Sequence, residues 1–95
     1  MKLHEFFDNH KWTQGTCAKD ANDQAVSTSD ERACKFCALG ALYVIYGDHI
    51  PHHVLNSVAE VFEPGFTGDA MSVITTYNDR HTKEDVLSLL RKANV

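Results

Sequence analysis

The chain has 95 residues, a hydrophobic fraction of 43% and a formal net charge of -4. This length and apolar content predict one folded domain over residues 1–95 and argue against disorder. The Lys and Arg residues are scattered, so we expect no nucleic-acid partner. No apolar run reaches the roughly 18 residues of a membrane span, and the N-terminus lacks a signal-peptide pattern, so we expect a cytoplasmic protein without a membrane partner. Three cysteines, an odd number, are typical of free thiols in a reducing compartment.

The first 26 residues predict a short helix followed by a β-hairpin. Apolar residues and a histidine recur at helical spacing over residues 3–10. Residues 12–17 include several β-prone types, residues 19–23 are typical of a turn, and residues 24–26 could return as a partner strand. A structured loop is the alternative for this segment.

The segment 29–46 predicts a central buried helix. Thr28 and Glu31 have the spacing of a capping box, and the residues that follow are apolar on nearly every side. Gly40 interrupts this apolar run, and we expect it to allow a neighbouring backbone to approach closely. Gly47 is placed to end the helix in the left-handed conformation.

Three more helices are expected in the second half. One begins near Pro51 and is stopped by the Pro-Gly pair that follows residue 63. The next is expected over residues 69–77, although the β-branched run 73–76 also fits a strand. Residues 78–81 suggest a polar connection, and Thr82 suggests a capping box for the last helix. The predicted fold is therefore mainly α, α+β at most: a compact bundle of four to five helices around a central buried helix, with an N-terminal β-hairpin.

Several short segments, in their order along the chain, resemble a small family of uncharacterised bacterial and phage proteins that is catalogued as a domain of unknown function. These segments are Trp12-Thr13-Gln14-Gly15 with Asp20, Cys37-Ala38-Leu39-Gly40-Ala41-Leu42, Tyr77-Asn78-Asp79 and Thr82-Lys83-Glu84-Asp85-Val86-Leu87. The resemblance implies a shared architecture and no established activity. The family pattern has a cysteine at the position of Cys37 and nothing fixed at Cys17 or Cys34, which argues against a three-cysteine metal site.

The residues suited to a metal are Cys34, Cys37, His49, His52 and His53. Thiolates and imidazoles are the ligands that zinc prefers, so these side chains make zinc binding an alternative function. However, both cysteines fall within the predicted helix, and cysteine often packs as a small buried hydrophobe. We therefore favour buried thiols and expect no cofactor.

A second group of polar residues could bind a small molecule or peptide: Gln14, Asp20, Asn78, Asp79 and His81. The competing interpretation is that the residues at 78–82 end one helix and cap the next.

The sequence favours a small non-catalytic binding or interaction protein. Exposed apolar residues such as Phe62 and Phe66 could make it a homo-oligomer or bind another protein. No hydrolase motif or phosphate-binding loop is present. An enzyme with a Cys or His active group is a further alternative, because such residues can meet in space from distant positions in the sequence.

Overall fold

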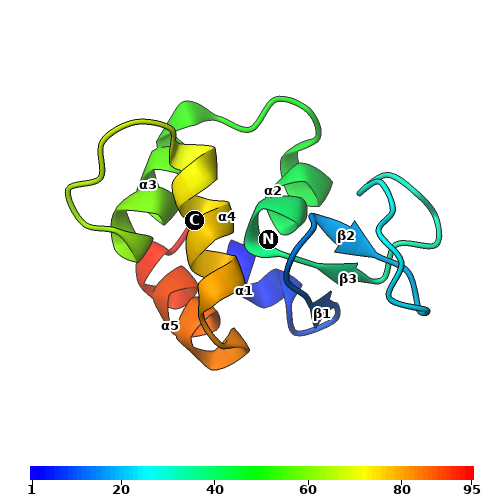
Figure 1. Cartoon of the computed structure of the whole chain (residues 1–95). Helices are drawn as coiled ribbons and strands as arrows, with labels where there is room; N and C mark the ends of the chain where they lie inside the picture. Colours follow the sequence, from blue (N-terminus) through cyan, green and yellow to red (C-terminus); the bar gives the residue numbers. More distant parts are fainter.

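The computed structural model describes all 95 residues and consists of five helices beside a small three-stranded sheet (Figure 1). The mainly α prediction is confirmed. The elements in chain order are α1 (Leu3–Phe6), β1 (Lys11–Trp12), β2 (Ala18–Lys19), β3 (Lys35–Phe36), α2 (Ala38–Tyr46), α3 (His52–Phe62), α4 (Ala70–Arg80) and α5 (Lys83–Ala93). No helix is long and apolar enough to cross a membrane.

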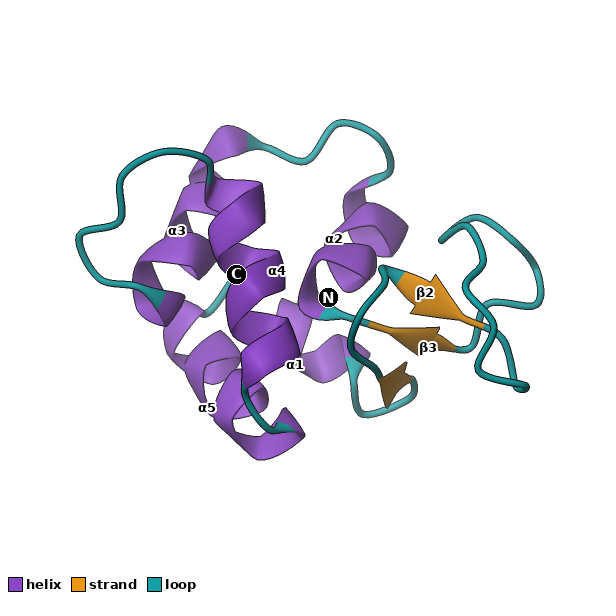
Figure 2. Cartoon of the chain, in the orientation of Figure 1, coloured by secondary structure: helices purple, strands orange, loops and turns teal.

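The sheet lies at one end of the molecule, beside α2 (Figure 2). Its central strand is β3, which pairs in parallel with β1 and antiparallel with β2. The predicted turn at 19–23 is present, and a bridge between Lys19 and Ala25 closes it as a short hairpin. The extended strand predicted over 12–17 is wrong, because residues 13–17 form a loop between β1 and β2. These two strands do not pair with each other, since β3 lies between them.

The central helix begins at Ala38 and not at residue 29, so the capping box predicted at Thr28 and Glu31 is wrong. An Asx turn occupies this region instead, because the Asp30 carboxylate accepts the Arg32 backbone N–H at 2.8 Å. The chain then runs as β3 before it enters α2. The segment 34–37 is therefore extended, and neither Cys34 nor Cys37 lies within a helix.

The first five residues of α2 are buried at the centre of the core. The last four are more exposed, and the Val44 side chain retains 43% exposure. Gly40 confirms the predicted close approach, since its neighbour is the backbone of Cys17. Gly47 ends the helix with a φ of 72°, as expected.

Helices α3, α4 and α5 pack together at the other end of the molecule (Figure 1). The Thr82 hydroxyl accepts the Asp85 N–H at 3.2 Å and caps α5, as predicted. Helix α4 begins after Asp69, which also agrees with the prediction, and it excludes the strand alternative over 73–76. The predicted polar connection at 78–81 is wrong, because α4 continues to Arg80 and places Asn78 and Asp79 on its last turn.

Candidate functional site

Asn78 joins the sheet to the helices. Its side chain is fully buried on the last turn of α4. The Oδ1 atom accepts the Trp12 indole N–H at 2.8 Å and the Ala38 backbone N–H at 3.0 Å. The Nδ2 group donates to the Thr13 carbonyl at 3.0 Å and to the Asp79 carboxylate at 3.2 Å. Asn78 therefore uses both of its polar atoms to hold β1, α2 and α4 together.

Gln14 and Gly15 attach the loop between β1 and β2 to the end of α4. The Gln14 Nε2 group donates to the carbonyl oxygens of Asn78, at 3.0 Å, and His81, at 2.7 Å. The Gly15 backbone N–H donates to Asp79 Oδ1 at 2.9 Å. Four of the five predicted ligand-binding residues thus lie together. These hydrogen bonds join them to one another and to other parts of the protein.

The fifth residue of that group, Asp20, is used elsewhere. Its carboxylate accepts the backbone N–H groups of Asn22, at 2.8 Å, and Gln24, at 3.0 Å. These bonds stabilise the turn after β2, and the structure does not bring Asp20 into hydrogen-bonding contact with the other four residues.

His81 ends α4 in an aromatic stack. Its ring lies parallel to that of Tyr77, with centroids 3.7 Å apart, and Tyr77 in turn stacks on Phe62 at 4.5 Å. The His81 Nδ1 atom lies 2.9 Å from the Tyr77 carbonyl oxygen. The stack packs α4 against α3, and it leaves Phe62 only 6% exposed.

Cys17 and Cys37 form a pair beside this polar network. The β2–β3 register aligns Ala18 with Phe36 and Lys19 with Lys35, so one further step places Cys17 opposite Cys37. The Cys37 N–H donates to the Cys17 carbonyl oxygen at 3.1 Å. Residues directly opposite in an antiparallel pair have side chains on the same face. The two side chains are close enough for each thiol to shift the pKa of the other.

Cys37 also caps α2. Its Sγ atom accepts the Gly40 backbone N–H at 3.3 Å, and its side chain is 2% exposed. The helix starts against the Cys17 backbone, where a Cβ at position 40 would lie 2.0 Å from the Cys17 carbonyl oxygen. Only glycine allows α2 to approach β2 so closely, and this approach holds the two thiols together.

A small cavity of about 120 Å³ opens at the thiol pair. Asp79 is its one charged lining residue. The lining consists of Gly15, Thr16, Cys17, Cys37, Thr75 and Asp79. Since Cys17 is partly exposed and Cys37 is buried, a molecule that enters this cavity meets Cys17 first.

The paired thiols titrate differently. The hydrogen bond from Cys37 lowers the pKa of Cys17 from 9.0 to about 7, against the opposing effects of burial and of the Asp79 carboxylate. The same hydrogen bond, together with burial, raises the pKa of Cys37 above its ordinary value. The pair therefore loses its first proton near neutral pH. The ionised sulfur is that of Cys17, and the remaining proton is the one that the pair shares.

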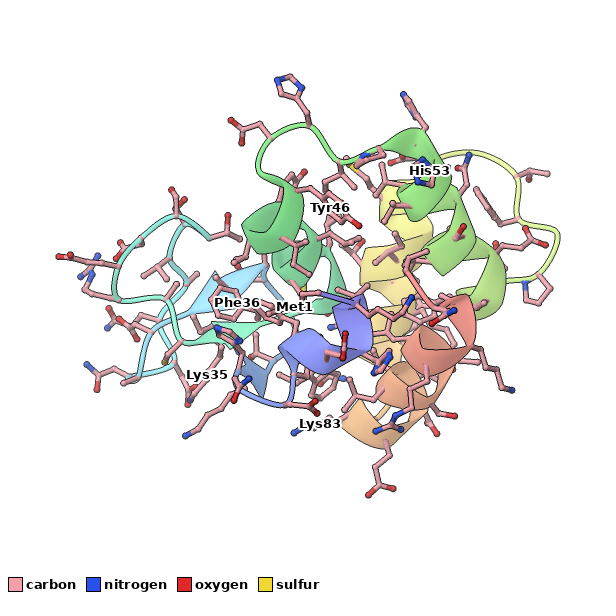
Figure 3. The ribbon with its side chains drawn as sticks, turned by 180° about the vertical axis from the view of Figure 1, so that it is seen from behind. Met1, Lys35, Phe36, Tyr46, His53 and Lys83 are labelled. Atoms are coloured by element: carbon pink, nitrogen blue, oxygen red, sulfur yellow. The ribbon has the colours of Figure 1, made fainter.

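The residues considered for zinc are not brought together. Cys34 and Cys37 are three residues apart in extended chain, where such side chains point to opposite faces. Figure 3 shows His53 at the start of α3, on the other side of the molecule from Lys35 and Phe36 of β3. His49 and His52 belong to the same region as His53, at the entry to α3. No group of three or more His, Cys, Asp or Glu side chains could hold a metal ion.

The sequence did not single out Gly15 or Thr75 as site residues, and it indicated Cys17 only as part of a disfavoured three-cysteine metal site. Cys17 is opposite Cys37 only because β3 lies between β1 and β2, and sequence spacing alone does not give that strand order. One available signal was Gly40, which indicated that a backbone segment packs against the start of the cysteine-bearing helix.

The fold and the site define a small, mainly α protein in which a buried asparagine network adjoins a cavity with two thiols. The chain belongs to the family described as "Family of unknown function (DUF6197)", whose model matches residues 2–94. This match confirms the resemblance to an uncharacterised family and spans every segment that carried it. No curated protein and no solved structure matches the chain.

Proposed function

We propose that this chain is a dithiol protein whose Cys17 and Cys37 exchange electrons with small disulfides. The observation that carries the proposal is the placement of the two thiols, on residues directly opposite each other next to the β2–β3 ladder and in the lining of one cavity. Of the functions considered from the sequence, this is closest to an enzyme with a cysteine active group. The second thiol takes the part that a histidine would have played.

The backbone geometry supports formation of a disulfide between these residues. Opposite residues that share a ladder hydrogen bond have Cα atoms about 5.5 Å apart, and disulfides span Cα separations of about 4.4–6.8 Å. Cys37 N–H and Cys17 O share such a bond. The two sulfurs can therefore join with little backbone movement.

The reaction proceeds in two exchange steps. The Cys17 thiolate attacks one sulfur of the small disulfide, forms a mixed disulfide and releases the other half as a thiol after protonation. Cys37 then loses its proton and attacks the Cys17 sulfur, which closes the Cys17–Cys37 disulfide and releases the second thiol. The protein loses two electrons and the Cys37 proton, the solvent supplies the second proton, and the small disulfide is reduced to two thiols.

Each thiol has the environment that its step requires. Cys17 is the more exposed of the pair and the one whose pKa is lowered, so it is the thiolate that meets the disulfide. Cys37 is buried and protonated until the mixed disulfide forms, so it acts second. The resemblance implies a fixed cysteine only at the position of Cys37, so the complete pair is proposed for this chain alone.

Redox titration with intact mass measurement tests the proposal. The reduced protein is equilibrated with dithiothreitol buffers of increasing oxidised fraction, quenched with an alkylating reagent under denaturing conditions so that the buried Cys37 also reacts, and weighed. Wild type and Cys34→Ser are expected to lose two alkylatable thiols together, without gaining mass from the buffer. Cys17→Ser and Cys37→Ser are expected to form no internal disulfide.

Cys34→Ser is the matched control, because it removes one thiol and leaves the pair intact. The proposal is overturned if all three thiols stay alkylatable up to fully oxidising buffer. It is also overturned if the disulfide that forms contains Cys34.

The interaction hypothesis has a different supporting observation. Val44 and Ile45 lie with Met1, Phe6 and His10 around a shallow, mainly apolar hollow, and the Val44 side chain is exposed. We propose a second copy of this chain as the occupant of this surface. It replaces the predicted contact through Phe62, which is buried, and Phe66, which is half-buried. Sedimentation of wild type should show a concentration-dependent dimer that Val44→Glu abolishes, and a monomer at every concentration would reject it.

A further inference from the structure

We infer that the Asp79 carboxylate selects the charge of the disulfide, so that the substrates are small disulfides with amine groups and not carboxylate groups. This inference rests on the proposed dithiol function and adds the substrate class to it. The juxtaposition that carries it is one carboxylate and two thiols around a single small cavity.

Asp79 is held in place but keeps one oxygen free. Both of its hydrogen bonds, from the Gly15 N–H at 2.9 Å and the Asn78 Nδ2 group at 3.2 Å, end on Oδ1. The Oδ2 atom has no hydrogen-bond partner within the protein. A carboxylate fixed through one oxygen can accept a hydrogen bond from a bound ammonium group through the other.

The surrounding charge favours a cation at this cavity. The other five lining residues carry no fixed charge, and Asp79 is close enough to act electrostatically on Cys17. The chain as a whole has a net charge of -4, and the reactive Cys17 thiolate adds one more negative charge to the site. A disulfide with carboxylate groups is therefore repelled at this cavity.

The cavity volume matches a short ligand arm. Its volume of about 120 Å³ corresponds to about four water molecules at roughly 30 Å³ each. One sulfur, two carbons and an amine nitrogen form a group of that size. The geometry therefore fits an aminoethylthio arm, with its sulfur at Cys17 and its ammonium group at Asp79.

Exchange rates with three disulfides of similar size test this selection. The probes are cystamine, which is a dication, hydroxyethyl disulfide, which is neutral, and dithiodiglycolate, which is a dianion. Loss of alkylatable Cys17 and Cys37 is followed at low ionic strength in Cys34→Ser protein. We expect the rate ratio of cystamine to dithiodiglycolate to be at least about tenfold larger for the protein than for a free small thiol, with the neutral probe between them. The free thiol corrects for the different leaving-group pKa values of the three probes.

Two variants separate the effect of Asp79 from that of overall charge. Asp79→Asn removes the charge and retains an oxygen that can accept the Gly15 N–H. Asp8→Asn removes the same charge from an exposed position. The rate ratio of cystamine to dithiodiglycolate should fall several-fold in Asp79→Asn and stay near the wild-type value in Asp8→Asn. Added salt should reduce the wild-type ratio.

The outcomes distinguish this inference from the function on which it rests. Rate ratios equal to those of the free small thiol, with an internal disulfide formed each time, overturn the charge selection and leave the dithiol function standing. An equal fall of the ratio in both variants, or no fall in Asp79→Asn, overturns the assignment to Asp79. Failure of every probe to produce the Cys17–Cys37 disulfide overturns the proposed function itself.

Discussion

Gly40 lies against the carbonyl group of Cys17, so closely that a Cβ at position 40 would be 2.0 Å from the Cys17 oxygen. This contact fixes the distance between α2 and β2. Since Cys37 begins the same helix and pairs with Cys17 through the ladder, the glycine also fixes the separation of the two thiols.

Gly40→Ala should destabilise the protein although alanine is the better helix former. The added methyl group meets backbone and not a flexible side chain, so overpacking of about 3 kcal/mol outweighs a helix-propensity gain of about 1 kcal/mol. We expect a net loss of about 2 kcal/mol in the free energy of unfolding, measured by urea denaturation. The Cys17–Cys37 disulfide should also form less readily.

Gly65→Ala is the control for this change. Gly65 has a φ of +74° and open space around its Cα. Alanine there should cost about 1 kcal/mol through backbone strain alone and leave the thiol pair unchanged. An equal effect of both substitutions on disulfide formation would contradict the structural role assigned to Gly40.

The helices of the second half were predictable because their signals are local. Thr82, Pro51 and Asp69 stand at the starts of three helices, and the apolar residues behind them repeat at helical spacing. The end of α4 was missed because Asn78 and Asp79 are polar, which suggested a loop. They remain helical because partners distant in sequence, Trp12, Thr13 and Gly15, satisfy their side chains.

The start of the central helix was mispredicted for a similar reason. The capping-box spacing at Thr28 competes with the Asx turn that Asp30 forms with Arg32, and the turn prevails. Residues 34–37 continue the apolar pattern that predicts the helix, but they pair instead with β1 on one side and with β2 on the other. Pairing between distant segments therefore overrides the local pattern.

Asn78→Ala should strongly destabilise the fold. It leaves the Trp12 indole N–H, the Ala38 N–H and the Thr13 carbonyl without their partner. Each buried polar group left unsatisfied costs about 1–3 kcal/mol. We expect a loss of at least about 3 kcal/mol, which is a large share of the roughly 5–15 kcal/mol that stabilises a domain.

Circular dichroism during urea denaturation measures this loss, with Asn56→Ala as the matched control. Asn56 is exposed on α3, so the control should change stability by no more than about 0.5 kcal/mol. Similar stability of the two variants would show that the Asn78 hydrogen bonds contribute little.

The candidate site was partly predictable. The family resemblance rests on separate segments that contain Trp12, Gln14, Cys37, Asn78 and Asp79. The structure brings these residues together in one network beside one cavity. Sequence spacing could not assign a role to these residues. The side chains of Trp12, Gln14 and Asn78 mainly make hydrogen bonds that hold the fold together. Cys17 could be recognised as a site residue only once the strand order of the sheet was known. That order depends on pairing between segments far apart in sequence.

His10 and His81 should both exist, when neutral, as the tautomer protonated at Nδ1. Each Nδ1 atom lies 2.9 Å from the carbonyl oxygen four residues earlier, and a carbonyl can only accept a hydrogen bond. Each ring also stacks on the aromatic residue that carries that carbonyl, Phe6 or Tyr77. Long-range proton–nitrogen correlation spectra of neutral imidazoles measure the tautomer directly.

His52 is the internal reference in the same spectrum, because it is exposed and makes no side-chain hydrogen bond. Its nitrogen shifts should report a mixture of tautomers. The assignment fails if His10 and His81 give the same mixture as His52.

Alkylation of Cys17 should titrate near neutral pH. In Cys34→Ser protein the rate of reaction with iodoacetamide is expected to rise with a midpoint at a pKa of about 7, because the Cys37 thiol stabilises the Cys17 thiolate by a hydrogen bond. Adding Cys37→Ala removes that donor and should move the midpoint to higher pH. Adding Cys37→Ser retains a hydroxyl donor and should move it less. Equal midpoints in all three proteins would contradict the shared proton.

The same pair gives stability a pH dependence with a definite sign. Because the pKa of Cys17 falls from 9.0 to about 7 on folding, the unfolded chain binds more protons between these values. Stability from Cys17 is therefore fully present above pH 9.0 and is lost as the pH falls through about 7. Cys37 acts in the opposite direction, since its raised pKa keeps it protonated while the unfolded chain ionises at high pH. Urea midpoints of Cys34→Ser protein should rise from neutral pH toward pH 9.0, whereas Cys17→Ser in that background should lack the rise. A rise that survives loss of Cys17 would assign the effect to other groups.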